Sequence, residues 1–181
     1  RNNNFAEGVY WGDTHLHTSY STDAGMIGNT LPPEAAYKFA MGEEVVTSSG
    51  QRARLIRPLD FLVVADHAEN LGLAPMIAED NPELLATRNG RRVSELVKAG
   101  EGYEAFQIWG EEGIARNTDI IDNPKMTRTV WDRQIKYADQ YNDPGNFTAF
   151  IGFEWTSINT IEEPSNLHRV VVFKDDGIKA S

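Results

Sequence analysis

Short apolar runs alternate with polar, glycine-bearing stretches along the chain, and four of the runs predict β-strands. Residues 9–17 begin with strand-forming side chains and become polar toward their end. Residues 58–67 contain a continuous apolar run, which is typical of a strand that is buried on both faces of a parallel sheet. Residues 147–154 and 167–173 predict the third and fourth strands.

The segments between these strands predict helices and loops. Residues 32–41 begin with two prolines, which fit the first turn of a helix, and residues 127–141 repeat apolar positions at helical spacing. Residues 18–30 are polar and contain glycine, so they predict a loop. Residues 68–125 predict a long, mostly helical polar excursion on the outside of the fold. The order of elements favours a single α/β domain over residues 1–181 with a largely parallel sheet, in which the last two strands are either parallel or an antiparallel pair.

Composition and charge exclude several classes of protein. With 40% hydrophobic residues the chain can bury a core, and its formal net charge of −10 leaves no excess of cations for binding nucleic acid. The absence of cysteine excludes disulfides, thiolate metal sites and cysteine nucleophiles. No apolar run is long enough to predict a membrane span. The chain begins with Arg1 rather than methionine, which indicates a processed chain and slightly favours an exported protein over a cytoplasmic one.

The end of the first predicted strand carries two histidines, His15 and His17. Residues two apart in a strand point to the same face, so both imidazoles can chelate one divalent ion. Asp13 shares this face if the strand is regular, and Asp23 lies on the loop that follows. The histidine pair alone is a weak signal, because two polar residues at an exposed strand end give the same pattern.

Polar groups also end the second and third predicted strands. Asp66 and His67 follow the apolar run of the second strand, and we interpret His67 as a metal ligand. Asp66 is either a functional carboxylate or the cap of a following helix. Glu154 ends the third strand close to Gly152, and a buried carboxylate is costly unless it is paired or coordinated. A carboxylate that bridges two metal ions suits this position, and a Glu154 that points to solvent is the alternative.

The fourth histidine, His168, begins the last apolar run. Because α/β sites form at the C-terminal ends of parallel strands, this strand either begins earlier or runs antiparallel. Arg169 faces the other way unless the strand is bulged; it would bind an anionic substrate group in the site, or form a salt bridge on the surface. The other three histidines and the carboxylate are placed at C-terminal strand ends, and their convergence predicts a metal site.

These motifs resemble the polymerase and histidinol phosphatase (PHP) superfamily, and within it a bacterial branch described only as a domain of unknown function. The matching motifs follow one another in the right order over nearly the whole chain. They are Gly12-Asp13-Thr14-His15-Leu16-His17-Thr18, then Asp23, then Ala65-Asp66-His67, then Gly152-Phe153-Glu154-Trp155, then Asn166-Leu167-His168-Arg169. The resemblance implies a distorted (β/α)7 TIM-like barrel, of which this chain forms an incomplete part.

The resemblance also implies a site with two or three divalent ions, which would be Zn, Mn or Fe. By this resemblance the first ion is bound by His15 and His17, the second by His168 and the third by Asp23 and His67, with Glu154 as the bridge between the first two. The superfamily further supplies a later histidine and a terminal Asp-x-His pair, which no residue after His168 provides. We therefore expect this chain to be an N-terminal fragment with incomplete metal coordination.

The sequence thus predicts a metal-dependent hydrolase, favoured as a phosphoesterase, that uses a metal-activated water at a di- or trinuclear site on a small anionic substrate. Asp13, Asp66 and Arg169 are its candidate catalytic residues. The alternative is a non-catalytic metal-binding or interaction domain that retains part of a barrel and forms a homo-oligomer through an open sheet edge. A serine hydrolase is disfavoured, because the chain has no Gly-x-Ser-x-Gly elbow.

Overall fold

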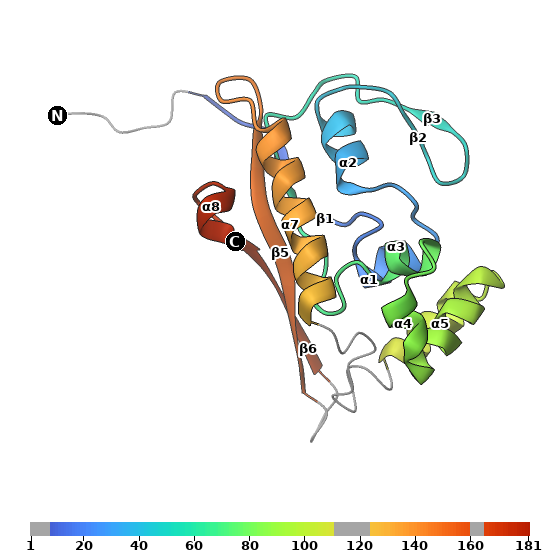
Figure 1. Cartoon of the computed structure of the whole chain (residues 1–181). Helices are drawn as coiled ribbons and strands as arrows, with labels where there is room; N and C mark the ends of the chain where they lie inside the picture. The colour runs from blue at the N-terminus through green and yellow to red at the C-terminus, as the bar shows by residue number, and fades with distance from the viewer. Residues whose placement is uncertain (1–7, 111–123, 160–164) are drawn as a thin grey trace.

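A four-stranded sheet forms the centre of the protein, whose computed structural model describes residues 8–110, 124–159 and 165–181 (Figure 1). The strands lie in the spatial order β1-β4-β5-β6. They are β1 (Gly12–Leu16), β4 (Phe61–Val64), β5 (Thr148–Asn159) and β6 (Ser165–Val172). The sheet curls into half a barrel and is covered by helices, which confirms the predicted α/β class.

The first three strands of the sheet are parallel, and the last pair is antiparallel. β4 pairs with β1 on one side and with β5 on the other, and long helical connections allow these strands to return in the same direction. β5 and β6 keep a continuous antiparallel register, with Glu154 opposite Val170 and Thr156 opposite His168. The irregular placement of His168 is thereby explained, because its strand begins before residue 167 and runs antiparallel.

Two helices cover one face of the sheet, α2 (Pro33–Ala40) and α7 (Pro124–Tyr141) (Figure 1). Both helices were predicted, although α7 begins earlier than residue 127. Their apolar side chains and those of the sheet form one buried cluster. It contains Tyr37, Ala40, Leu62, Val64, Ile135, Ala138, Phe147, Ala149, Ile151 and Ala180. The opposite face of β5 carries Gly152 and the side chains of Glu154 and Thr156, since residues two apart share a face.

The remaining helices are short and pack around a second apolar cluster beside the sheet (Figure 1). They are α1 (Thr22–Met26), α3 (Leu73–Ala78), α4 (Pro82–Ala86), α5 (Arg88–Lys98) and α6 (Gly102–Ile108). Leu73, Ile77, Leu84 and Val93 are buried there, so residues 68–110 have a core of their own and are not merely a polar excursion. Residues 111–123 of the predicted excursion lie outside the described residues.

Several predicted boundaries were wrong. The stretch predicted as a loop over residues 18–30 contains α1, whose five residues are too few to show a period. A hairpin of β2 (Val45–Val46) and β3 (Arg52–Ala53) and a terminal helix, α8 (Gly177–Ala180), were not predicted. The first strand begins only at Gly12, because that residue is the first to pair with β4, and the aromatic residues before it are exposed. Among the described helices, none is long and apolar enough to cross a membrane.

A buried side chain of α7 links the end of β4 to β5. Gln134, which is 1% exposed, donates from Nε2 to the carbonyl oxygens of Val64 (3.1 Å) and Gly152 (2.9 Å). A Cβ atom on Gly152 would lie 2.7 Å from the carbonyl oxygen of Val171, so only glycine fits this position without a shift. Beyond Gly152, β4 has ended, but the residues that follow it still pair with β5 through the bridge between His67 and Glu154, while β6 pairs with the other edge of β5. Glu154 therefore stands level with the segment that follows β4.

Candidate metal centre

The predicted ligands come from the ends of parallel strands that meet at one level of the sheet. His15 lies in β1, His17 follows it, and His67 follows β4 and forms an isolated parallel bridge with Glu154. The prediction that Glu154 ends its strand was wrong, because β6 supplies a partner as far as Asn159. Glu154 nevertheless lies beside His67, which follows the end of β4, so it is at the same level of the sheet as the histidines.

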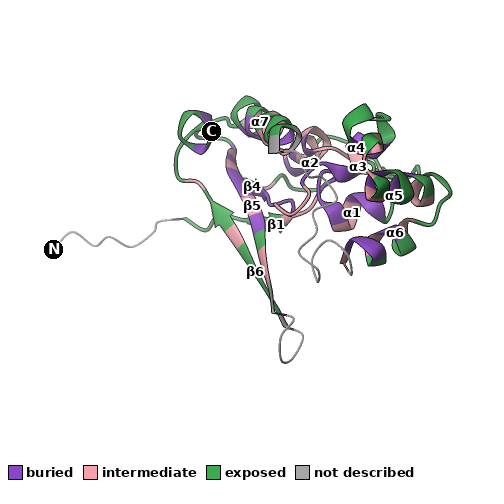
Figure 2. Cartoon of the chain, turned by 60° about the horizontal axis from the view of Figure 1, so that its bottom comes forward, coloured by how far each residue is buried: buried purple, intermediate pink, exposed green. Residues whose placement is uncertain are grey.

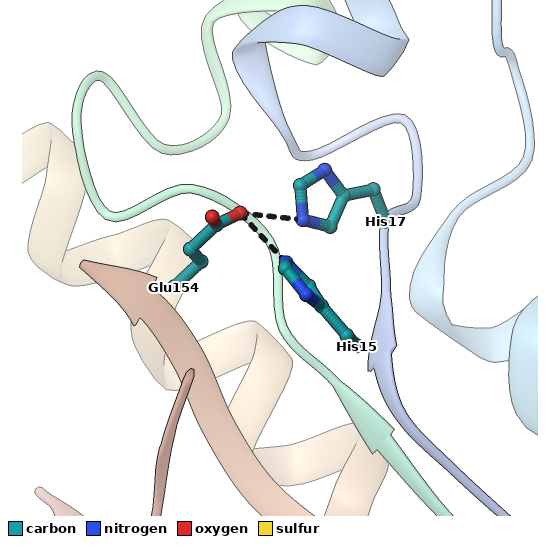
Figure 3. A group of neighbouring side chains, drawn as sticks. All are labelled: His15, His17 and Glu154. Carbon is teal, nitrogen blue, oxygen red and sulfur yellow. Dashed lines mark ion pairs between the residues drawn. The ribbon is translucent and has the colours of Figure 1, made fainter. Parts of the chain in front are cut away.

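Glu154 is the centre of the cluster, and only 1% of this residue is exposed. Its Oε2 atom lies 2.9 Å from Nε2 of His15 and 2.8 Å from Nε2 of His17 (Figure 3). The same oxygen is 3.5 Å from Nε2 of His67. The other oxygen, Oε1, lies 2.6 Å from Nδ1 of His168. All four histidines of the chain therefore surround one buried carboxylate.

Asp23 extends the cluster on the side of α1. Its Oδ2 atom lies 3.0 Å from Nδ1 of His17 and 3.7 Å from Nε2 of His67. The buried hydroxyl of Ser21 donates to Oδ1 of Asp23 at 2.5 Å and accepts the N–H of His67 at 3.1 Å. The short helix α1 thus holds Asp23 beside the two histidines. The structure brings together all six residues that were predicted as metal ligands: His15, His17, Asp23, His67, Glu154 and His168.

Three overlapping groups of these residues could each hold a metal ion, because their ligand atoms lie within 4.8 Å of one another. The groups are His15, His17 and Glu154; His17, Asp23 and His67; and His67, Glu154 and His168. Nitrogen and carboxylate oxygen ligands of this kind suit zinc, manganese or iron. The ligands expected from the PHP resemblance fall into these groups in the same combinations. His15 and His17, expected at the first ion, share one group, and Asp23 and His67, expected at the third, share another. His168, expected at the second ion, shares the last group with Glu154.

Two buried atoms of the cluster support a bound cation. Nε2 of His17 and Oε2 of Glu154 are buried and have no hydrogen-bond partner, although only 2.8 Å separates them. Both atoms belong to the group of His15, His17 and Glu154, whose ligand atoms lie close enough together to meet at one point. Buried polar atoms are rarely left without a partner, and a cation at that point would satisfy both. The residues present therefore fit a divalent ion.

The carboxylates of the cluster favour positive charge on their neighbours. Burial lowers the pKa of His17, but the hydrogen bond to Asp23 and the charges of Asp23 and Glu154 outweigh burial and raise its pKa above 6.5. Burial raises the pKa of Glu154, yet the close approach of His15 and the charges of the other histidines lower it below 4.5 overall. Despite its burial, hydrogen bonds from His17 and Ser21 hold the pKa of Asp23 well below its usual range. Both carboxylates are therefore charged at neutral pH and attract either protons or metal ions to the imidazoles.

These pKa shifts predict how metal binding depends on pH. A histidine binds metal only as neutral imidazole, and the pKa of His17 is raised above 6.5, so protons compete with the ion from above pH 6.5 downward. The affinity of the chain for Zn²⁺ or Mn²⁺ is expected to fall by tenfold or more from pH 8 to pH 6. Isothermal titration calorimetry in buffers of different ionisation enthalpy would measure the affinity and the protons released. An affinity that stays constant over this range would contradict the assignment of His17.

Two residues that were not predicted orient the histidines. Oγ1 of Thr156 lies 3.1 Å from Nδ1 of His67 and 3.2 Å from Nδ1 of His168. Oε2 of Glu69 lies 3.5 Å from Nδ1 of His67, while its Oε1 accepts the N–H of Thr156. His67 faces Glu154 through Nε2, so these two groups contact its second nitrogen, and such groups fix the ring orientation of a ligating histidine. At His168, Thr156 contacts the same nitrogen that faces Glu154. Thr156 carried a signal in the sequence, since it lies two residues after Glu154 on the same strand face; Glu69 carried none.

Asp66 is a buried carboxylate that holds the loop after β1. It is fully buried and accepts the backbone N–H of Thr18 with Oδ1 and the Thr18 hydroxyl, at 2.7 Å, with Oδ2. The predicted alternative of a helix cap was wrong, because α3 begins only at Leu73 with Gly72 as its N-cap. Burial raises the pKa of Asp66 to about 6, against the hydrogen bonds from Thr18, which lower it. Asp66 thus positions the segment between His17 and Asp23.

The other two candidate catalytic residues, Asp13 and Arg169, lie apart from the centre. Asp13 is exposed, and its Oδ1 accepts the backbone N–H of His15 at 2.8 Å. The register of β1 is irregular between Asp13 and Leu16, so the condition of a regular strand, on which its shared face depended, does not hold. Arg169 is exposed and stands opposite Trp155 in an unbulged register, which places it on the other face from His168. This exposed position agrees with the surface location that the alternative prediction, a surface salt bridge, requires.

The sequence as a whole is similar to one described protein family. The family described as "Protein of unknown function (DUF3604)" matches residues 4–181. No curated protein and no solved structure matches the chain. The matched residues include every member of the histidine and carboxylate cluster. The chain belongs to the DUF3604 family.

Proposed function

We propose that this chain carries the metal centre of a hydrolase that cleaves phosphate esters, with two or three divalent ions at the cluster around Glu154. The observation that carries this proposal is the buried Oε2 atom of Glu154, which three imidazole Nε2 atoms approach within 3.5 Å. The chain has four histidines, and all of them lie around this one carboxylate. All of its imidazole ligands for a metal ion are therefore at a single site.

Each part of the cluster has a role in this proposal. Glu154 would hold ions through both of its oxygens, because each of them faces an imidazole. The neutral imidazoles would provide the other ligands, and Thr156 and Glu69 hold the ring of His67 in orientation. Bound divalent ions at such a site lower the pKa of water and stabilise negative charge on ester oxygens. His168, whose side chain is 41% exposed, forms the rim at which a substrate enters.

The charge of the cluster favours an anionic substrate only when cations are bound. The ligand groups are imidazoles and carboxylates, and the whole chain has a formal net charge of −10. A phosphate group would therefore be repelled by the empty cluster and attracted by the loaded one. This coupling explains why a phosphoesterase would use several ions. The arrangement of the ligands at the C-terminal ends of β1 and β4 also supports our proposal that the half-barrel belongs to a distorted (β/α)7 barrel of PHP type.

The proposed activity can be tested with the chain loaded with Mn²⁺ or Zn²⁺. We expect turnover of at least one compound in a panel of phosphate monoesters and diesters, with complete loss on addition of EDTA and recovery on addition of metal. The panel includes sulfate esters and amides, which the same chemistry can cleave. Turnover of sulfate esters or amides alone would contradict the phosphoesterase assignment, and activity that persists in EDTA would contradict the metal-dependent mechanism.

One observation favours a second function, that of a non-catalytic metal-binding or interaction domain. β6 lies at the edge of the sheet and exposes Leu167, Val171 and Val172 (Figure 2). An apolar edge strand can pair with another copy of the chain. Self-association that metal strengthens, together with no turnover across the panel, would favour this function over hydrolysis.

A further inference from the structure

A second concave site lies in the helical part of the molecule. It is a groove of about 800 Å³ between α1, α3 and the junction of α5 with α6. These helices contact one another beside the sheet (Figure 2). The six residues of the metal cluster are all described by the structure, and none of them lines the groove. The groove is therefore a separate site from the metal centre.

The lining of this groove is mostly apolar. Met26 of α1 and Ile77 of α3 line it as members of the second apolar cluster, and each is only 2% exposed. Ile27 and Tyr103 also line it, but they are 61% and 67% exposed. Two large side chains thus leave apolar surface to solvent beside the groove. Covering that surface with an apolar group would lower the free energy.

Close packing of the backbone holds the walls of the groove in place. A Cβ atom on Gly102, the first residue of α6, would overlap the carbonyl oxygen of Met26. A Cβ atom on Gly25 would lie 2.5 Å from the Cβ atom of Ala74. The helix α1 therefore contacts both α6 and α3 too closely for a side chain at either glycine. The groove is bounded by helices whose positions are fixed by these contacts.

The charges along the groove cancel. Of the described residues that line it, Glu79 and Lys98 alone are charged. Each already has a partner of opposite charge, because Oε1 of Glu79 lies 3.5 Å from Nη1 of Arg133 and Nζ of Lys98 pairs with Asp80. A charged ligand would have to displace one of these pairs or leave its own charge without a partner. The charge balance therefore favours an uncharged occupant.

We propose that this groove binds an uncharged, apolar small molecule that carries an aromatic ring. Its volume lies within the range of about 300–1,000 Å³ that is typical of small-molecule sites in proteins. The apolar lining supplies the affinity, and the exposed ring of Tyr103 offers a surface on which an aromatic ligand stacks. This binding function is additional to the proposed hydrolase and does not depend on bound metal.

Titration with N-phenyl-1-naphthylamine, an uncharged aromatic dye whose fluorescence rises in apolar surroundings, tests this proposal. The chain is expected to bind the dye at a saturable site with the same affinity in EDTA and in Mn²⁺. Ile27→Asp places an unpaired carboxylate beside the groove and is expected to weaken binding about tenfold or more. Ile56→Asp is the matched control, because Ile56 is fully exposed and does not line the groove. It should keep the wild-type affinity.

A second pair of variants fills the groove instead of charging it. Ala78 is the exposed last residue of α3 and lines the groove, so Ala78→Trp places a large ring within it. Ala86 is the exposed last residue of α4 and lies outside the lining. We expect Ala78→Trp to weaken dye binding about tenfold and Ala86→Trp to leave it unchanged. Circular dichroism should show all four variants folded, since each changes an exposed residue.

Each outcome decides for or against the groove. Weakened binding in Ile27→Asp or Ala78→Trp, with both controls unchanged, supports it. The proposal would be overturned by a chain that does not bind the dye saturably, by variants that bind like their controls in both pairs, or by dye that Mn²⁺ displaces. Sedimentation velocity that shows a dimer dissociated by Ile27→Asp would also overturn it, because a second copy of the chain would then cover the groove. None of these results bears on hydrolysis at the metal centre.

Discussion

Replacing Glu154 by glutamine is expected to lower the affinity of the chain for Zn²⁺ or Mn²⁺ by about a hundredfold or more. The carboxylate is the one group that faces all four histidines, and both of its oxygens lie within 3 Å of an imidazole nitrogen. Glutamine keeps the shape of the side chain but loses the negative charge and replaces one oxygen by an NH₂ group, which repels a cation. Competition titration with a metal-sensitive dye would measure the change in affinity.

A matched substitution separates loss of a ligand from general loss of charge. Glu95 is exposed on α5, and Glu95→Gln removes one carboxylate from the chain without touching the cluster. This control should bind metal as the wild type does. Circular dichroism should show both variants folded, since Gln134 and the β5–β6 ladder hold the backbone around Glu154 independently of its charge. An affinity of Glu154→Gln within threefold of the control would mean that the cluster does not bind the ion through this residue.

Replacing Asp66 by alanine is expected to destabilise the fold by about 3 kcal/mol. The substitution removes two acceptors from Thr18, which is 2% exposed, and leaves its buried backbone N–H without a partner. It also opens a space in a region where water has little access. Urea denaturation of the metal-free chain would measure the free energy of unfolding.

Asp60 provides the control for this second substitution, because it makes a similar link at the other end of the same two strands. Oδ2 of Asp60 accepts the backbone N–H of Trp11 at 2.6 Å, but this bond is exposed, so water can replace the carboxylate. Asp60→Ala is expected to cost about 0.5 kcal/mol or less. Equal costs for Asp60→Ala and Asp66→Ala would show that burial of the Asp66–Thr18 bonds contributes nothing, and that Asp66 does not fix the segment between His17 and Asp23.

The sequence predicted the central strands and the six residues that the structure gathers at the cluster because each left a local signal. The apolar run that contains Phe61–Val64 was long enough to indicate a buried strand, and polar residues at its end indicated the level of the site. His15 in β1 and His17 after it stand at strand spacing, although the irregular register between Asp13 and Leu16 shows that spacing alone did not fix their directions. Parallel pairing then brought these ends together, as the rule for α/β sheets predicts.

Features that depend on contacts distant in the sequence could not be predicted. β5 continues past Glu154 because β6 pairs with it, and this pairing is not encoded in residues 147–154 themselves. The five-residue helix that carries Asp23 depends on the cluster of apolar side chains behind it, which includes Met26 and Leu73. The role of Asp66 was open because a functional carboxylate and a helix cap give the same pattern in the sequence. Only the start of α3 at Leu73 and the hydrogen bonds from Thr18 show that it holds the loop after β1.

Anomalous diffraction from crystals of the chain grown with Mn²⁺ or Zn²⁺ would test the proposed metal centre most directly. The arrangement of Glu154 and the histidines predicts two or three anomalous peaks within coordination distance of the Glu154 carboxylate, one of them also bound by Nε2 of His17. Peaks only at other sites, or none at the cluster with millimolar metal present at pH 8, would contradict it.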